Sequence, residues 1–160
     1  MLFKNLEKYT IVLASQSPRR QYLLNELGIK FSTAPSKEVN ESFPDHLKAQ
    51  EIPLYLCKKK ANAFENEMSE NTLLITADTI VWIDGQVLNK PNDPDDAVRM
   101  LKLLSGNKHE VYTGVCLKTR DKTNCFYART IVYFKTLSEE EIDYYINNYN
   151  PYDKAGGYGA

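Results

Sequence analysis

The sequence has little of several features that define whole classes of protein. Its 160 residues contain only seven glycines, seven prolines and three cysteines, and 42% of them are hydrophobic. This composition excludes collagen-like, low-complexity and wholly disordered chains. No apolar run approaches the roughly 18 residues of a membrane helix, and the N-terminal MLFKNLEKYT lacks the apolar stretch of a signal peptide. We therefore expect one globular domain over residues 1–160, with no membrane span.

The charge and the cysteines exclude further classes. Twenty basic and twenty-one acidic residues give a formal net charge of −1, so no overall field attracts nucleic acid or an anionic membrane. The cysteines Cys57, Cys116 and Cys125 are odd in number, are widely spaced and contain no C-x-x-C pair. This pattern argues against a disulfide framework and favours a reducing compartment. The sequence predicts a cytoplasmic protein in which any anion site is a local cluster of basic residues.

Strand-like and helix-like segments alternate along the chain. Apolar and β-branched runs predict strands at 10–14, 29–34, 73–77, 80–83, 86–88, 109–118 and 124–136. Capping residues and helical spacing predict helices that begin near Pro18, after the cap Ser17, and near Pro53 and Pro94. A Ser138/Glu141 capping box predicts a last helix at 139–149. Because helices and strands interleave and Asp84-Gly85 predicts a hairpin, the fold class is α/β, with a mixed central sheet flanked by helices.

The same pattern predicts a buried helix face, the ends of two elements and the state of the C-terminal residues. Leu23, Leu24 and Leu27 are expected to share the buried face of the first helix. The second helix is expected to run to about Met68, and Asp78 is expected to end the strand 73–77. On composition alone, the glycine-rich residues 151–160 predict a flexible tail.

Two segments have side chains suited to phosphate or metal chemistry. Residues 15–20 (SQSPRR) lie between a strand end and a helix start, where unpaired N–H groups favour phosphate. Arg19 and Arg20 could each hold phosphate oxygens through paired hydrogen bonds. Asp78 lies at the end of an apolar run, where a carboxylate can hold Mg²⁺ or act as a base. A plain helix cap and an ordinary strand-ending Asp stay open as alternatives.

Basic residues elsewhere could complete such a site. Lys60 flanks the apolar face of its predicted helix, whereas Lys58 and Lys59 point away from that face. A solvated charge run remains the alternative for all three. Lys90 follows the predicted hairpin, and the glycines after Lys154 would let the backbone approach a ligand closely.

Other motifs of catalysis are missing from the sequence. His46 and His109 show no metal-binding spacing and pair with no nucleophile in a Ser-His-Asp pattern. There is no G-x-G-x-x-G and no P-loop. Tyr144, Tyr145 and Tyr149 fall on or near one face of the last predicted helix, which predicts a core contact or a contact in a homodimer.

Taken together, the motifs resemble the Maf family from residue 11 to the end of the chain. The segments that carry the resemblance are LASQSPRRQYLL, NESFP, KKKANAF, ITADTIVWIDGQVLNKP, MLKLLSG, HEVYTGV and PYDKAGGYG. The resemblance implies a fold of two lobes around a cleft, and hydrolysis of a nucleoside triphosphate to a monophosphate and pyrophosphate. Arg19 after S-P and Thr79 after Asp78 are similar to the dTTP/UTP type, not to the type that acts on 7-methyl-GTP.

The resemblance also implies the roles of individual residues. Asp78 would be the catalytic base, and Glu41 and Asp78 would hold Mg²⁺ or Mn²⁺. The residues expected to contact the substrate are Ser15, Arg19, Arg20, Lys60, Thr79, Lys90 and Lys154. Two other functions stay open: a non-catalytic module that binds nucleotides or a cell-division partner, and a pyrophosphatase that removes modified pyrimidine nucleotides.

The sequence departs from the family at its C-terminal end. The family pattern continues past Y-G with a hydrophobic residue, a Gln that contributes to specificity in the dTTP/UTP type, and a further stretch of strands and helix. Here the sequence stops at Ala160. We therefore expect a C-terminus that is short relative to the family.

Overall fold

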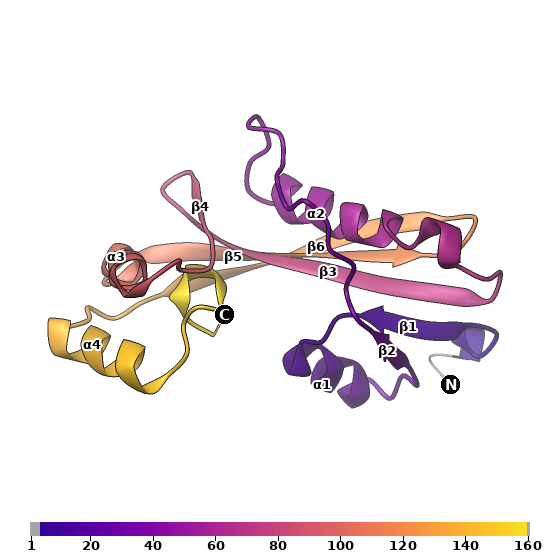
Figure 1. The fold of residues 1–160 in the computed structure, drawn as a ribbon, viewed down its shortest axis with the longest axis horizontal. Helices are drawn as coiled ribbons and strands as arrows, with labels where there is room; N and C mark the ends of the chain where they lie inside the picture. Colours follow the sequence, from indigo (N-terminus) through magenta and orange to yellow (C-terminus); the bar gives the residue numbers. More distant parts are fainter. Residues whose placement is uncertain (1–3, 160) are drawn as a thin grey trace. The chain divides into compact units, whose positions relative to one another are not determined.

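A computed structural model describes residues 4–159 and gives the α/β architecture that the sequence predicts (Figure 1). The strands are β1 (Thr10–Ala14), β2 (Ser32–Ala34), β3 (Thr72–Ile83), β4 (Gln86–Leu88), β5 (Lys108–Lys118) and β6 (Thr123–Tyr133). The helices are α1 (Pro18–Glu26), α2 (Glu51–Asn62), α3 (Pro94–Leu104) and α4 (Glu139–Asn148). Single 3₁₀ turns lie at Lys4–Leu6, Glu65–Glu67 and Ala155–Gly157.

The six strands form one mixed sheet in the order β2-β1-β3-β5-β6, and β4 pairs with β3. β1 runs parallel to both of its neighbours, with Ile11 opposite Leu73 on β3 and Leu13 opposite Thr33 on β2. β3 and β4 are antiparallel and are joined by the predicted Asp84-Gly85 turn. Helix-containing connections join the strands of these parallel pairs, as parallel pairing requires, and a short turn joins the antiparallel β3 and β4.

The described residues divide into two compact units. Unit 1 contains residues 4–47, Glu51–Asp78 and Gly114–Tyr127, and unit 2 contains Lys48–Gln50, Thr79–Thr113 and residues 128–159. β3 passes from unit 1 to unit 2 between Asp78 and Thr79 without a break in its strand structure. Each unit has an apolar core of its own.

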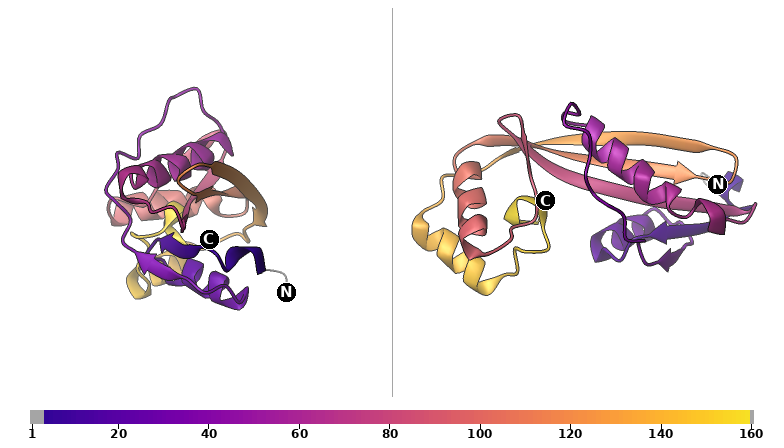
Figure 2. Two further views of the ribbon diagram at one scale, coloured as in Figure 1. Left: turned by 90° about the vertical axis from the view of Figure 1, so that its right-hand side faces the viewer. Right: turned by 45° about the horizontal axis from the view of Figure 1, so that its top comes forward.

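The core of unit 1 lies on the two faces of its strands. Between α2 and the sheet, the buried cluster consists of Ala14, Cys57, Ala61, Met68, Leu74 and Cys116. A second buried cluster, which α1 helps to cover through Leu24, consists of Ile11, Leu13 and Ile75. Figure 2 shows α2 lying along the strands of this unit. In β3 the even-numbered Leu74 belongs to the first cluster and the odd-numbered Ile75 to the second, as strand alternation requires.

The core of unit 2 lies between α3 and the second half of β3. Its buried members are Val81, Ile83, Leu88, Met100 and Leu104. Ala155 and Tyr158 pack against this cluster, and the Gly156 amide donates to the Asn89 carbonyl at 3.1 Å. Gly156 has a φ of 73°, a left-handed value that favours glycine. The expectation of a flexible tail at 151–160 is therefore wrong for residues 151–159, because glycines let the chain turn back and pack.

Three further expectations differ from the structure. No residue of α1, which is described throughout, is buried, and Leu23 and Leu27 are more than half exposed. Of the three leucines, only Leu24 packs against the core, because the neighbouring edge strand β2 is too short to cover a wide helix face. α2 ends at Asn62, because the Phe64 amide donates to Ala61 three residues earlier and tightens the chain.

Asp78 does not end its strand. β3 continues to Ile83 because the residues that follow, such as Ile80 and Val81, are themselves buried strand residues. The carboxylate also finds a partner without leaving the sheet, as described below. None of the helices within residues 4–159 is long and apolar enough to cross a membrane.

Gly114 on β5 allows α2 to approach the sheet closely, which gives a prediction for stability. A Cβ at position 114 would lie 2.6 Å from the Pro53 carbonyl oxygen and 2.7 Å from its carbonyl carbon. We expect Gly114→Ala to lower the free energy of unfolding by about 1–3 kcal/mol, because the backbone of α2 must shift. Urea titration measures this loss.

The matched control is Gly159→Ala, since an added Cβ there meets nothing within 4 Å. We expect the control to change the unfolding free energy by less than about 0.5 kcal/mol. Equal stability of the two variants would show that α2 does not depend on the missing side chain at Gly114.

Candidate active site

The site is centred on a buried ion pair in unit 1. Lys60, in the last turn of α2, donates from Nζ to Oδ1 of Asp78 on β3 over 2.8 Å. The Glu41 carboxylate, from the loop between β2 and α2, approaches the same Nζ at 3.6 Å. The Lys60 and Asp78 side chains are only 18% and 12% exposed, whereas the Glu41 side chain is 65% exposed. One ammonium thus lies between a buried carboxylate and a solvated one.

A buried hydrogen bond sets the position of α2 on β3. The Thr76 hydroxyl donates to the Cys57 carbonyl at 2.7 Å. Thr76 and Asp78 are two residues apart on β3 and so share a face of the strand. Cys57 and Lys60 are three residues apart on α2 and so lie on adjacent turns of one helix face. This single bond therefore places Lys60 over Asp78.

Burial and the neighbouring Lys60 charge shift the pKa of Asp78 in opposite directions. Removal from water raises the pKa of its carboxyl, while the Lys60 ammonium lowers that pKa through charge and a hydrogen bond. The nearby Glu41 charge raises the Asp78 pKa, and Arg20 lowers it. The net shift is upward, which gives Asp78 greater affinity for a proton than a solvated aspartate has.

The turn before α1 brings further polar groups to unit 1. Ser17 caps the helix by accepting from the Arg20 amide at 3.3 Å, and the Ser17 amide donates to the hydroxyl of the buried Ser15 at 3.1 Å. The Arg20 guanidinium reaches the carbonyl of Ala77, the residue before Asp78, at 3.2 Å. Burial lowers the Arg20 pKa and the Asp78 charge raises it. Arg19 is exposed at the start of the same helix.

Three predicted site residues belong to unit 2. The Thr79 hydroxyl lies 2.9 Å from the Thr113 hydroxyl, and strand alternation directs it to the face of β3 opposite Asp78. Lys154 donates from Nζ to the Asn150 carbonyl at 2.8 Å and to the Asp153 carboxylate at 3.0 Å.

Lys154 and Lys90 both act on the same carboxyl. The Lys154 hydrogen bond, and to a smaller extent the Lys90 charge, lower the pKa of Asp153. The predicted site residues are divided between the two units. Unit 1 contains Ser15, Arg19, Arg20, Glu41, Lys60 and Asp78, and unit 2 contains Thr79, Lys90 and Lys154.

The donor set around Lys60 fits a hard divalent cation that is held partly by substrate. Glu41 and Asp78 offer carboxylate oxygens near one point, where the Lys60 ammonium now lies. Across residues 4–159 there is no cluster of three or more His, Cys, Asp or Glu side chains that could hold a metal alone. Mg²⁺ commonly takes one or two carboxylates and completes its shell with waters and phosphate oxygens. The residues present fit that mode of binding.

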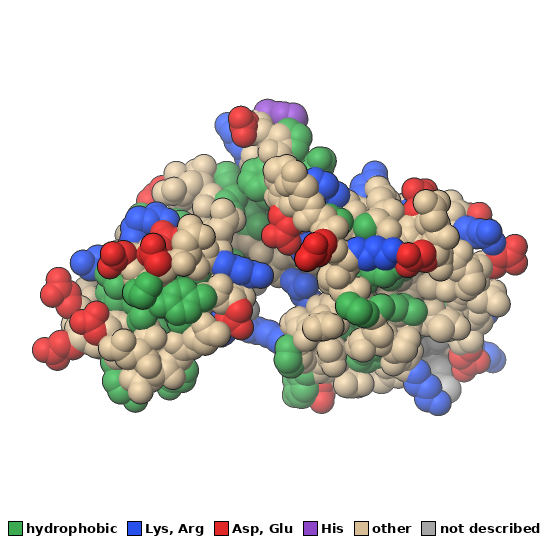
Figure 3. Space-filling view, in the orientation of Figure 1, with side chains coloured by type: hydrophobic (Ala, Val, Ile, Leu, Met, Phe, Trp, Pro, Cys, Tyr) green, Lys and Arg blue, Asp and Glu red, His purple; other side chains and the backbone are tan. Residues whose placement is uncertain are grey.

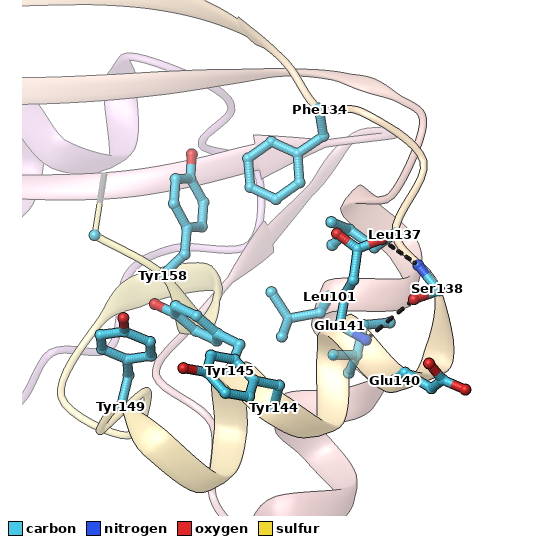
Figure 4. A pocket seen from close by; sticks show the side chains of 12 residues that line it. Leu101, Phe134, Leu137, Ser138, Glu140, Glu141, Tyr144, Tyr145, Tyr149 and Tyr158 are labelled. Carbon is cyan, nitrogen blue, oxygen red and sulfur yellow. Dashed lines mark hydrogen bonds between the residues drawn. The ribbon is translucent and has the colours of Figure 1, made fainter.

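Two features of the structure were missed by the sequence analysis. The first is Thr76, whose hydroxyl binds α2. It lies two residues before Asp78 and so shares its strand face, and this spacing could have indicated it from the sequence. The second is a cavity of about 760 Å³ in unit 2 (Figure 4). Tyr144 and Tyr145 of α4 and Tyr149, the residue that follows the helix, line it together with Leu101 and Phe134. None of the predicted site residues lines this cavity.

The surface agrees with the balanced composition. Figure 3 shows basic and acidic side chains interspersed over the face that it presents, with no extended patch of one sign. That Arg20 and Lys60 form a local anion site stays a prediction, and no wider field of one sign on this face competes with it.

Comparison with known proteins first defines the fold. The structure of the Staphylococcus aureus Ham1 protein matches with a TM-score of 0.51 at 13% sequence identity, over 78% of this chain and 71% of that one. At this identity the match establishes a shared α/β fold. The family model described as "Maf-like protein" matches residues 10–160, and the chain belongs to the Maf family.

Relatives named dTTP/UTP pyrophosphatase match over nearly the whole chain. One from Phocaeicola vulgatus is 55% identical over 158 residues, which are 99% of this chain and 82% of that protein. One from Flavobacterium johnsoniae is 50% identical over 159 residues, again 99% of this chain and 81% of the relative.

The Lys60–Asp78 pair leads to a prediction for pKa values. Lys60→Met removes the ammonium that favours the ionised carboxylate while the apolar surroundings remain, so the Asp78 pKa should rise above its value in the parent protein. Nuclear magnetic resonance of the Asp78 carboxyl carbon during a pH titration measures this shift directly. Lys58→Met is the matched control, because Lys58 is exposed on the same helix. An Asp78 midpoint that does not move in Lys60→Met would contradict the pairing.

Proposed function

We propose that this chain hydrolyses dTTP and UTP between the α- and β-phosphates and releases a nucleoside monophosphate and pyrophosphate. The observation that carries the proposal is the cluster of Asp78, Lys60 and Glu41 next to Arg20. This cluster combines a base, cations and metal-ligating oxygens in one unit. Membership of the Maf family supports the reaction class, and the relatives named dTTP/UTP pyrophosphatase support the substrate.

Asp78 acts as the general base. A water molecule attacks the α-phosphorus, and Asp78 accepts the proton that the water loses. The raised pKa of Asp78 makes it a stronger base than a solvated aspartate, and the Lys60 ammonium favours its ionised form. Pyrophosphate is a stable leaving group, so the reaction needs no covalent intermediate on the protein.

Glu41 and Asp78 would hold Mg²⁺ or Mn²⁺ together with phosphate oxygens of the substrate. A divalent cation, when bound there, supplies positive charge that offsets the phosphates and lowers the pKa of an attacking water. Lys60 is already held between both carboxylates, so it keeps them close together before substrate binds.

The remaining predicted residues bind the triphosphate. Arg19 and Arg20, at the start of α1, would contact phosphate oxygens, helped by the partial positive charge of the helix N-terminus. Ser15 keeps the turn before this helix in shape through its bond to the Ser17 amide. Lys90 and Lys154 of unit 2 would add two more positive charges. Such a site works mainly by positioning and by electrostatic stabilisation of the transition state.

Selectivity for the pyrimidine base would involve Arg19 and Thr79, the two residues that resemble the dTTP/UTP type. The Thr79 hydroxyl is already paired with that of Thr113, so it has a fixed orientation within unit 2. A site built from hydrogen-bonding groups rejects a base that leaves those groups unpaired.

Removing the base tests the mechanism. Asp78→Asn keeps the shape of the side chain but cannot accept the proton, so we expect pyrophosphate release from UTP to fall about 100-fold or more. Asp121→Asn, in the exposed β5–β6 turn, is the control and should keep parent activity. Circular dichroism and thermal unfolding check that both variants fold. Parent-like turnover by a folded Asp78→Asn protein would remove Asp78 from the role of base.

A substrate panel tests the proposed selectivity. With Mg²⁺ present, we expect kcat/KM for dTTP and UTP to exceed that for ATP and GTP by about tenfold or more, which corresponds to about 1.4 kcal/mol in the transition state. Pyrophosphate release is the readout, and isothermal titration calorimetry reports binding separately. Binding without turnover would favour a nucleotide-binding module, and equal turnover of all four would exclude pyrimidine selectivity.

A further inference from the structure

The three cysteines, far apart in sequence, meet in one apolar cluster of unit 1. Cys57 on α2 and Cys116 on β5 are fully buried members, and Cys125 on β6 packs against them while partly exposed. All three are free thiols. The proposed hydrolysis uses none of them.

Hydrogen bonds near the turn define how β5 and β6 pair around these thiols. The Thr119 amide donates to the Lys122 carbonyl at 2.8 Å across the turn. Counting away from that pair places Lys118 opposite Thr123, and their side chains are indeed in contact, with Lys118 Nζ 3.2 Å from the Thr123 hydroxyl. Two steps further, Cys116 lies directly opposite Cys125.

This pairing suits a disulfide. Hydrogen-bonded and non-hydrogen-bonded pairs alternate along an antiparallel ladder. Thr119 and Lys122 form a hydrogen-bonded pair. Cys116 and Cys125 lie three steps further along, so they form a non-hydrogen-bonded pair. Opposite Cα atoms at such positions are about 4.5 Å apart, and side chains there point to the same face of the sheet. Disulfides span Cα separations of about 4.4–6.8 Å.

The surroundings distinguish the three thiols from one another. Cys125 is the accessible one, because it lies on β6, an edge strand in the sheet order of the described residues. The Cys57 thiol donates to the Leu54 carbonyl of its own helix at 3.3 Å, and it lies on α2, outside the strand ladder that pairs Cys116 with Cys125. Burial raises the pKa of both Cys57 and Cys116 to about 12, so each stays protonated until a reactive partner reaches it.

We propose that Cys125 is a site of oxidation by peroxide and that Cys116 resolves it into a reversible cross-strand disulfide. In the first step, the Cys125 sulfur attacks one peroxide oxygen, giving a sulfenic acid and one water. In the second, the Cys116 sulfur attacks the Cys125 sulfur, and its thiol proton leaves with the hydroxyl as a second water. Two thiols are oxidised and one hydrogen peroxide is reduced to two waters.

The test treats the full chain with hydrogen peroxide, blocks the remaining thiols with N-ethylmaleimide under denaturing conditions, and measures intact mass and peptides. We expect one blocked thiol per chain, at Cys57, and one peptide crosslink, between Cys116 and Cys125. Dithiothreitol should restore three blockable thiols. A crosslink from Cys57, a crosslink between two chains, or three blockable thiols after peroxide would each overturn the proposal.

Variants separate pairing from general reactivity. Cys125→Ser should abolish the crosslink, and Cys57→Ser should keep it. Cys125 is partly exposed, so its replacement by serine has little effect on the core, and thermal unfolding verifies this. In Cys116→Ala, peroxide should leave Cys125 as a sulfenic acid that dimedone traps, with a matching gain in mass. A crosslink that persists in Cys125→Ser would overturn the role of Cys125.

Discussion

Lys60 and Asp78 form an ion pair that is largely withdrawn from water, and Glu41 and Arg20 lie beside it. A buried carboxylate without a partner is expensive, and its usual response is to take up a proton. Lys60 offsets that cost, and the Thr76 hydroxyl fixes the helix that presents Lys60. Gly114 lets the same helix reach the strands. Packing of α2 and the protonation of Asp78 are therefore parts of one structural arrangement.

The same arrangement shows how a chain with almost no net charge can offer a site for a highly charged substrate. The cations are few, but burial strengthens their effect on neighbouring groups because little water screens them. Arg20 contacts the backbone one residue before Asp78, so its charge acts at short range on the same carboxylate. A surface lysine run would be screened within about 10 Å by salt. In the proposed site, local burial and not overall charge would provide the attraction for the substrate.

Much of this could be predicted from local sequence signals. The Ser17 cap, the Asp84-Gly85 hairpin and the Ser138/Glu141 capping box each depend on a few neighbouring residues, and all three are present. Helical spacing separated Lys60 from Lys58 and Lys59 because the direction of a side chain on a helix depends only on its position along it. The family resemblance is confirmed by the match over residues 10–160.

Features that depend on distant partners could not be predicted in this way. Leu23 and Leu27 have helical spacing, but whether they are buried depends on the extent of the neighbouring strands. Asp78 resembles a strand end unless one knows that Lys60 lies over it. Gly156 and Gly157 predict a flexible tail when only the local sequence is considered. In the structure they lie against Asn89 and Pro91, which are distant in the sequence. In each case the missing information was the chemistry of a residue far away in the sequence.

The unbroken course of β3 through Asp78 has a consequence for how this segment can change in length during evolution. Side chains in a strand alternate, so inserting or deleting one residue just after Leu74 would exchange the faces to which Thr76 and Asp78 point. An insertion of two residues would restore the alternation. Variants that keep the Asp78 carboxylate under α2 can therefore gain or lose only an even number of residues in this part of β3. Backbone geometry alone imposes this restriction.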